Sequence, residues 1–291
     1  MDVISKAFLD VVIQPGQHPD EREAMRSMLE HFHPDNPEKY IITADRGYES
    51  YDNIFLCELK KLNYVFRVKA PSSAKSLLSS YSSELPDEQE EFDVKIKRFF
   101  TRKCTTIMKD QSDVYHYMNP SKNAPHFDEL LNGKDLHYLE FRVLKIKTGD
   151  NTYEYIITNL PYSFDINDIK DCYHWRWGIE ISFRYLKHAN GLLHFHSKKP
   201  EFLKQEIYAN LILYNFGIFL ANEAAKENDK KKGRNPINIS IPWIFPPPLS
   251  FHGNISSEKN PIKRWILLVL LQNMFMLLKL NSANLPDLFA A

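Results

Sequence analysis

The sequence predicts an α/β protein in which a mixed sheet with helices is interrupted by a β-rich segment. Three patterns support this fold class. Near the start, short apolar runs that end at turn residues alternate with segments whose apolar residues have helical spacing. From Glu91 to Thr158, apolar and polar side chains then alternate. Beyond that stretch, Asp165 to Lys187 and Glu201 to Ala225 return to helical spacing of the apolar residues.

The first seventy residues predict strands and helices in alternation. The apolar run AFLDVVI, Ala7 to Ile13, predicts a strand that ends before Pro15. The acidic stretch from Asp20 to Glu23 predicts the first turn of a helix that ends at Pro34. Further elements are expected at Tyr40–Ala44 (strand), Tyr51–Lys61 (helix) and Tyr64–Lys69 (strand).

The middle of the chain predicts an inserted β meander. Residues 71–91 are rich in Ser, Pro and Glu and predict a loop. Four strand-like segments follow, joined by polar linkers: FDVKIKRFF, VYHYM, YLEFRVLKI and TYEYIIT. Near the other end, residues 226–235 are charged, and the three prolines of IPWIFPPPLS exclude a helix or a central strand there.

Composition excludes several classes of protein. Lys+Arg and Asp+Glu both number 37, which excludes a uniformly basic nucleic-acid binder and leaves only local basic stripes for a DNA partner. The three cysteines form neither a disulfide framework nor a zinc spacing, so we expect a reducing cytoplasm. The apolar stretch Trp265–Leu280 is shorter than the ~20 residues of a membrane span, so a buried helix is expected and no membrane partner.

Four residues that could take part in chemistry share one face of the helix expected over Asp165–Lys187. Counted from Tyr173, the offsets of Arg176, Glu180 and Lys187 are 3, 7 and 14, which on one helix fall within about 60° of each other. Arg184 projects nearby, whereas the opposite side is expected to face a core with Trp175, Ile179, Ser182 and Leu186. A carboxylate flanked by cations suits phosphodiester chemistry, because it can hold a divalent metal while Arg and Lys bind phosphates. Spacing alone favours an exposed helix with the i,i+4 ion pairs Arg176–Glu180 and Glu180–Arg184.

The motif Y-x2-R-x3-E-x6-K, present as YHWRWGIEISFRYLK, resembles the signature of the DDE transposases of the insertion-sequence-4 family. The neighbouring HANGLLHFHSKK and EFLKQEIYANLILYNF also resemble that family, and the resemblance runs from about Ala7 to Phe216. It implies that Glu180 is the last metal ligand, for Mg²⁺ or Mn²⁺. It also implies that Tyr173, Arg176 and Lys187 contact the DNA end, chiefly at phosphates.

Asp45 is the second candidate carboxylate. It ends an expected strand, and carboxylates at the carboxyl ends of strands point to the rim where α/β active sites lie. Taken alone, Asp45 before Arg46 and Gly47 is more typical of an ordinary turn residue. With the resemblance, TADRGYES and YVFRVK correspond to the region of the second aspartate of the triad. The β-rich stretch then resembles the family's insertion, whose basic residues either line the DNA or form a solvated strand face: Lys95, Lys97, Arg98, Arg102 and Lys103.

The resemblance also implies a ribonuclease-H-like core whose first aspartate lies on a central first strand. Only Asp2 and Asp10 precede the first expected helix, and neither matches that position. We therefore expect the first strands and the first catalytic aspartate to be absent, as in a truncated reading frame. The expected division is a partial ribonuclease-H-like core (1–70), a β-rich insertion (71–162), core helices with Glu180 (163–226) and a divergent region (227–291).

Other residues carry weaker signals. His188, His194 and His196 lie close in sequence, but packing or surface roles are favoured over a metal site. Trp177 lies nearer the polar face than Trp175 and is a candidate for stacking on a base. Arg46 and Arg184 are candidate DNA contacts beside the two carboxylates.

Two functions therefore remain open. One is a transposase catalytic region that cleaves and joins DNA at insertion-sequence ends, inactive as a fragment and dimeric when complete. The other is a non-catalytic relic that binds DNA ends or a transposase and acts as an inhibitor. A different nuclease of the same fold is disfavoured by the Y-R-E-K motif. In either case we expect a bacterial cytoplasmic, nucleoid-associated protein.

Overall fold

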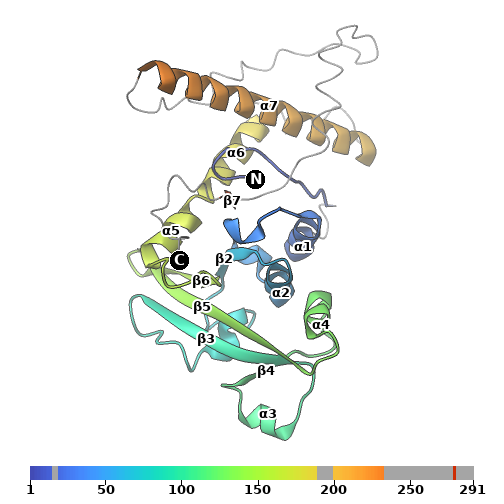
Figure 1. The fold of residues 1–291 in the computed structure, drawn as a ribbon, viewed down its shortest axis with the longest axis vertical. Coiled ribbons are helices and arrows are strands. Elements are labelled where there is room, and N and C mark those ends of the chain that lie inside the picture. The colour runs from blue at the N-terminus through green and yellow to red at the C-terminus, as the bar shows by residue number, and fades with distance from the viewer. Residues whose placement is uncertain (15–18, 189–198, 233–277, 280–291) are drawn as a thin grey trace. The chain divides into compact units, whose positions relative to one another are not determined.

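The computed structural model describes residues 1–14, 19–188, 199–232 and 278–279 (Figure 1). The chain divides into two compact units. The helical unit consists of Met1–Ile13 and Arg176–Leu277, and the sheet unit consists of Gln14–Trp175 and Leu278–Ala291. Each unit has its own core and is described separately.

The sheet unit begins with the elements that the sequence predicts. α1 spans Glu21–His31, and its N-cap Asp20 accepts hydrogen bonds from the amides of Arg22 and Glu23. The elements that follow are η1 (Pro37–Lys39), β1 (Tyr40–Ala44), η2 (Arg46–Tyr48), α2 (Tyr51–Leu59) and β2 (Asn63–Val68). β1 and β2 pair in parallel, so their carboxyl ends meet at one edge of the sheet.

The four strands predicted between Glu91 and Thr158 also form. These strands are β3 (Phe92–Thr101), β4 (Tyr115–Tyr117), β5 (Leu136–Gly149) and β6 (Thr152–Thr158). The short helices of the same part of the chain are η3 (Leu77–Tyr81), α3 (Thr106–Asp110) and α4 (Pro125–Leu131). The strand order is β4-β3-β5-β6-β2-β1-β7, where β7 is Leu278–Lys279. β6 pairs antiparallel with β2, so these strands extend the sheet that β1 and β2 begin.

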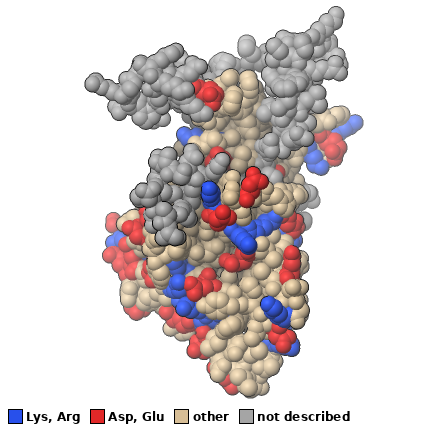
Figure 2. Space-filling model, in the orientation of Figure 1, with Lys and Arg blue, Asp and Glu red and all other residues tan. Residues whose placement is uncertain are grey.

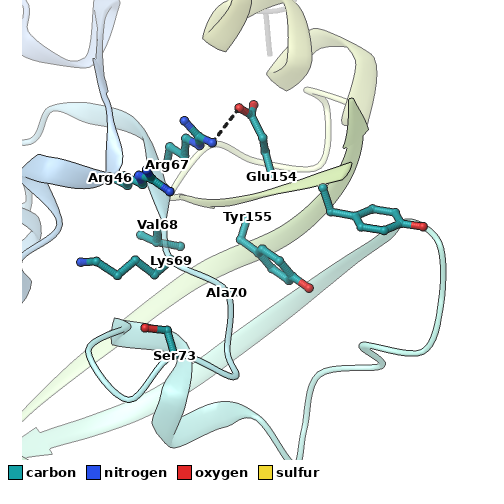
Figure 3. A pocket seen from close by; sticks show the side chains of 9 residues that line it. Arg46, Arg67, Val68, Lys69, Ala70, Ser73, Glu154 and Tyr155 are labelled. Carbon is teal, nitrogen blue, oxygen red and sulfur yellow. Dashed lines mark ion pairs between the residues drawn. The ribbon is translucent and has the colours of Figure 1, made fainter. Parts of the chain in front are cut away.

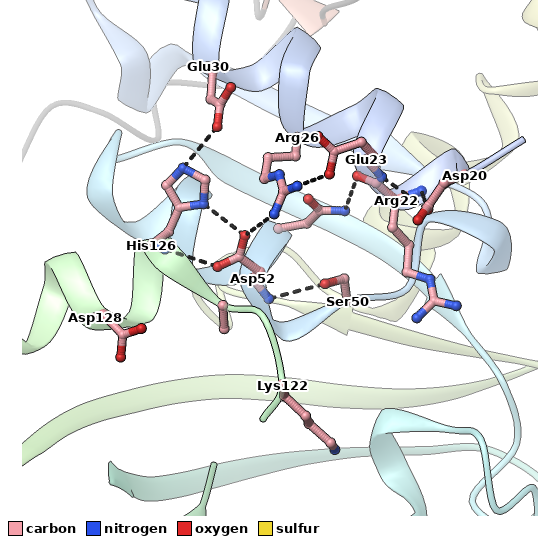
Figure 4. A network of polar contacts seen from close by, with 12 residues as sticks. Asp20, Arg22, Glu23, Arg26, Glu30, Ser50, Asp52, Lys122, His126 and Asp128 are labelled. Atoms are coloured by element: carbon pink, nitrogen blue, oxygen red, sulfur yellow. Dashed lines mark hydrogen bonds and ion pairs between the residues drawn. The ribbon is translucent and has the colours of Figure 1, made fainter. Parts of the chain in front are cut away.

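Helices α2 and α4 cover one face of the sheet at β3. The ring of Phe55 on α2 lies 4.7 Å from that of Phe127 on α4 and 5.3 Å from that of Phe100 on β3. A buried polar contact joins the same helices (Figure 4): Asp52 accepts from the backbone amide of His126 at 3.0 Å and contacts its Nδ1 at 2.9 Å. This pairing compensates the burial of a carboxylate, which is unfavourable without partners.

The helix predicted over Asp165–Lys187 is two helices in the structure, and this corrects the sequence interpretation. α5 spans Ile166–His174, begins with a capping box at Asp165, and ends before Trp175; α6 spans Trp177–His188. The break falls in HWRWG, where every residue except the arginine is a weak helix former. There the amide of Ile179 donates to the carbonyl of Arg176 at 2.9 Å, a tighter i,i+3 turn. The helical phase therefore does not carry through from Tyr173 to Glu180.

The helical unit has a core formed by the first residues, α6 and α7, where α7 spans Pro200–Lys232 and contains the predicted helix Glu201–Ala225. The expected inward positions of α6 are confirmed for Ile179, Ser182 and Leu186, which are buried. Their partners include Met1, Phe8, Leu211, Tyr214 and Ile218. The buried Ser182 hydroxyl accepts from Tyr214 at 2.8 Å, so its polar group is satisfied.

The strand predicted at Ala7–Ile13 is wrong, because this segment has no regular secondary structure and is not part of the sheet. The side-chain amide of Asn215 on α7 takes the place of a neighbouring strand. It accepts from the amide of Phe8 at 2.8 Å and donates to the carbonyl of Phe8 at 2.7 Å. Two apolar side chains of the run, Phe8 and Val11, pack on α6 and α7 instead.

Several expectations fall outside the described residues: those for His194 and His196, for the proline run, and for Trp265–Leu280 apart from the two residues of β7. Within the described residues, no helix has the length and apolarity of a membrane span. On the face drawn in Figure 2, basic and acidic side chains of the described residues are intermingled, in keeping with the zero net charge.

Candidate functional site

Asp45 lies directly after β1 and begins the short helix η2. Its Oδ1 atom accepts from the amide of Arg46 at 2.8 Å, which is the N-cap contact that fixes the turn. The side chain is 36% exposed. The sequence therefore placed this carboxylate correctly at the end of a strand, and the turn also positions Arg46.

Arg67 on β2 joins Asp45 to a second carboxylate that the sequence interpretation missed. One guanidinium nitrogen lies 3.2 Å from Asp45 Oδ1, and the other lies 3.2 Å from Glu154 Oε1 on β6. Partial burial disfavours the charge of Arg67, but the negative charges of Glu154 and Asp45 outweigh it and raise the pKa of the guanidinium. Arg67 therefore remains a cation between two carboxylates.

Tyr173 completes this cluster. It is buried at the end of α5, and its hydroxyl donates to Asp45 Oδ1 at 3.3 Å. The two residues are 128 positions apart. The structure thus brings together the tyrosine of the Y-x2-R-x3-E-x6-K motif and the aspartate of TADRGYES.

A cavity of about 330 Å³ opens beside Arg67 (Figure 3). Three cations and one carboxylate are among its lining residues: Arg46, Arg67, Lys69 and Glu154. Lys69 donates from its Nζ to the buried carboxylate of Glu49 at 3.1 Å, which anchors the end of β2. Guanidinium and ammonium groups are side chains that bind phosphate, and here Arg67 and Lys69 are paired with carboxylates that a phosphate would replace.

Arg67 lies on β2 and Lys69 follows the end of that strand, and the two residues, spaced by two in YVFRVK, both line the cavity. That spacing was a usable signal for the cavity. Glu154 carried no comparable signal, because its approach to Arg67 depends on the pairing of β2 with β6, two strands far apart in the sequence.

The helical unit holds the other candidate residues. Arg176 Nη2 lies 3.5 Å from Glu180 Oε1, the i,i+4 pair that spacing permitted. Glu180 is largely exposed and Arg176 largely buried. Arg184 is exposed on α6, and Lys187 belongs to the same helix, where its side chain is not described. Asp45 and Tyr173 belong to the sheet unit, and Glu180 belongs to the helical unit.

The two tryptophans beside Arg176 are both exposed, Trp175 at 47% and Trp177 at 54%. The expected core position of Trp175 is therefore wrong, because the residue sits at the break after α5 rather than on an inward helical face. Among the described residues, no group of three or more His, Cys, Asp or Glu side chains has the arrangement of a metal site.

The fold and site together define an α/β protein that places a carboxylate and a cavity lined by Arg and Lys side chains at the carboxyl ends of two parallel strands. The transposase DDE domain family matches residues 1–216, and the chain belongs to this family.

Individual relatives are similar over a shorter segment. The putative transposase InsL for insertion sequence element IS186A of Escherichia coli K12 is 38% identical over 58 residues, which is 20% of this chain and 16% of that protein. The transposase for insertion sequence element IS421 of Escherichia coli has the same identity and coverage. The match thus spans about one sixth of the length of these relatives.

Proposed function

We propose that this chain is the catalytic region of a transposase of the insertion-sequence-4 family, with a ribonuclease-H-like core, that cleaves and joins DNA at the ends of its element. The observation that carries the proposal is the hydrogen bond from Tyr173 to Asp45. Each residue belongs to a motif that resembles this family, and the motifs lie far apart in the sequence. Their meeting in one cluster supports a shared site.

In this proposal Asp45 and Glu180 are ligands of Mg²⁺ or Mn²⁺. Both offer the carboxylate oxygens that these cations prefer, and both side chains are accessible from solvent. Arg67 competes for Asp45, and Glu154 offers the guanidinium a second partner when Asp45 binds a cation. A divalent cation held there supplies activation of water and stabilisation of a leaving oxygen.

The basic residues serve as phosphate contacts in the same proposal. The side chains of Arg46, Arg67 and Lys69 line one cavity next to Asp45. A phosphate bound there takes the place of the carboxylates that pair with Arg67 and Lys69, because both groups offer oxygen atoms to the same cations. On the helical unit, Arg176, Arg184 and Lys187 contact the DNA beside Glu180, and the exposed Trp177 stacks on a base. The partners are the element ends and target DNA, bound by a homodimer in the bacterial cytoplasm on the nucleoid.

The test combines metal binding and DNA cleavage. Binding of Mn²⁺ is followed by electron paramagnetic resonance, and cleavage is assayed with Mg²⁺ on DNA that carries the ends of the element surrounding the gene. Asp45→Asn and Glu180→Gln should weaken Mn²⁺ binding and abolish cleavage, whereas Asp128→Asn, at an exposed carboxylate on α4, should change neither. A protein that binds the ends but does not cleave them supports the alternative, a DNA-binding inhibitor. Cleavage unaffected by both substitutions overturns the site.

A further inference from the structure

Three aromatic rings form a row across the sheet face opposite α2 and α4. Phe99 on β3 pairs in register with Tyr138 on β5 and with Tyr115 on β4. The ring of Phe99 lies 5.3 Å from that of Tyr138 and 6.1 Å from that of Tyr115. Side chains alternate along a strand, and the neighbouring Phe100 is buried against Phe55 on the other face.

Two rings of this row are exposed, Phe99 at 36% and Tyr138 at 45%, and Tyr115 is half-buried. No element in the described parts of the chain covers Phe99 or Tyr138. Single exposed apolar side chains are ordinary, but contiguous exposed aromatic groups mark a binding surface. The row is therefore a candidate binding surface.

Charged side chains lie on the same face further along β3, and they indicate which kind of partner this surface binds. Lys97 and Lys95 follow Phe99 at alternate positions, and Lys95 lies 5.3 Å from the ring of Tyr162, which is 53% exposed. Glu140 on β5 pairs with Lys95 and lies 3.8 Å from the Nζ of Lys97. Two cations, Lys97 and Lys95, thus lie between the aromatic row and Tyr162, and the step from Phe99 to Lys95 along β3 is four residues, or roughly 13 Å at about 3.3 Å per residue.

We propose that this strip, formed by Tyr115, Phe99, Tyr138, Lys97, Lys95 and Tyr162, binds single-stranded nucleic acid. Unpaired bases stack on the rings, and Lys95 and Lys97 bind the phosphates between them. Stacking of this kind is tolerant of sequence, because every base has an aromatic face. The inference adds a contact for unpaired DNA to the proposed function and does not involve the metal ligands.

Single strands fit this surface better than the other two classes of partner. In a duplex the faces of the bases are occupied by their neighbours, so exposed rings on a flat sheet meet only the backbone. A protein partner is disfavoured because the core of such an interface is depleted of lysine, whereas two lysines lie within the strip. Glu140 opposes phosphate binding, and this gives the proposal a specific test.

The test uses the full chain and a fluorescein-labelled oligothymidine of about 12 nucleotides, within the site size of known single-strand binders. Fluorescence anisotropy is measured in EDTA, so that metal binding plays no part. The double variant Phe99→Ala, Tyr138→Ala should lose about 10-fold or more in affinity, the equivalent of one stacked base. Tyr138→Phe keeps the ring and should retain affinity. Phe202→Ala, at an exposed ring on α7, is the matched control.

Glu140→Gln should tighten binding up to about fivefold, because it releases both lysines from an exposed ion pair. A purely structural role of this residue predicts no gain. Circular dichroism melts establish that each variant folds. Unchanged affinity in the double variant overturns the proposal, as does an equal loss for duplex DNA. If the double variant instead abolishes self-association in sedimentation and leaves oligothymidine binding intact, the face is a protein interface and the proposal is wrong. Asp45→Asn should leave this binding unchanged, which separates the strip from the metal site.

Discussion

Arg67 lies 3.2 Å from Asp45, and its other guanidinium nitrogen lies 3.2 Å from Glu154. The cation is thus shared by the candidate metal ligand and a carboxylate on a different strand. This arrangement neutralises Asp45 when no cation or phosphate is bound. It also keeps the guanidinium at the mouth of a cavity that is suited to a phosphate.

Replacing Arg67 should therefore weaken duplex binding in a salt-dependent way. In Arg67→Gln we expect the slope of log affinity against log salt to fall by about one phosphate. The same change is expected for Arg176→Gln and Lys187→Gln. Binding of element-end DNA is measured by fluorescence anisotropy between low and moderate salt. Lys170→Gln, an exposed cation that pairs with Glu91, serves as the control. Unchanged slopes in the three variants favour local ion pairing over DNA contact.

The Asp52–His126 contact should contribute more to stability than an exposed ion pair of the same unit. Asp52→Asn removes the charge that faces His126 and Arg26 within a buried site, so we expect a loss of about 1–3 kcal/mol in the free energy of unfolding. Asp128→Asn, whose carboxylate pairs with Arg102 at an exposed position, should cost about 1 kcal/mol or less. Urea unfolding of both variants measures the difference. Equal losses would show that burial of Asp52 adds nothing.

Sequence patterns predicted most of the sheet unit, because its elements are short and their limits are local. Asp45 could be placed at a strand end from YIITAD alone, and the strands of the β-rich segment follow from their alternation. Local signals also found the exposed position of Trp177. They do not contain the register between distant strands, and so the pairing that brings Glu154 to Arg67 was not predictable.

Two errors show how tertiary contacts change the meaning of a local pattern. The run Ala7–Ile13 has the composition of a strand, but a single side chain, Asn215, satisfies the backbone of Phe8 and leaves it against helices. The signature helix was expected to be continuous, but it breaks at Trp175. Tyr173 consequently reaches Asp45 from α5, and not from a face shared with Glu180.

His116 should make the stability of the sheet unit sensitive to acid. It lies within the aromatic group formed by Tyr51, Tyr81 and Phe100. Burial, with smaller effects of Lys122 and Arg98, lowers its pKa to about 4. The unfolded chain has a pKa of about 6.5 for histidine.

Above about pH 6.5, this histidine is neutral in both states and carries no penalty. As the pH falls from about 6.5 towards 4, the unfolded state binds the proton first, and stability is lost by at most about 3 kcal/mol. Urea unfolding of the parent chain and of His116→Phe at several pH values isolates this contribution. We expect a smaller loss in the variant across this range, and parallel curves would contradict the assignment.

Asp45 and Glu180 should come together when a divalent cation is bound. The proposed chemistry requires both carboxylates to hold the same pair of cations, which lie about 4 Å apart in such sites, so the two carboxyl groups should be within about 8 Å of each other. The measurement is an experimental structure of the chain with Mn²⁺ and element-end DNA. Double electron–electron resonance between spin labels on α2 and α7 offers a check in solution, since it reports the distance between the two units with and without the cation. A separation of about 15 Å or more in the loaded complex would falsify the shared site, because no cation pair spans that distance. In that case Asp45, Arg67 and Tyr173 remain a phosphate-binding cluster of the sheet unit, and Glu180 a residue of an ordinary helical ion pair.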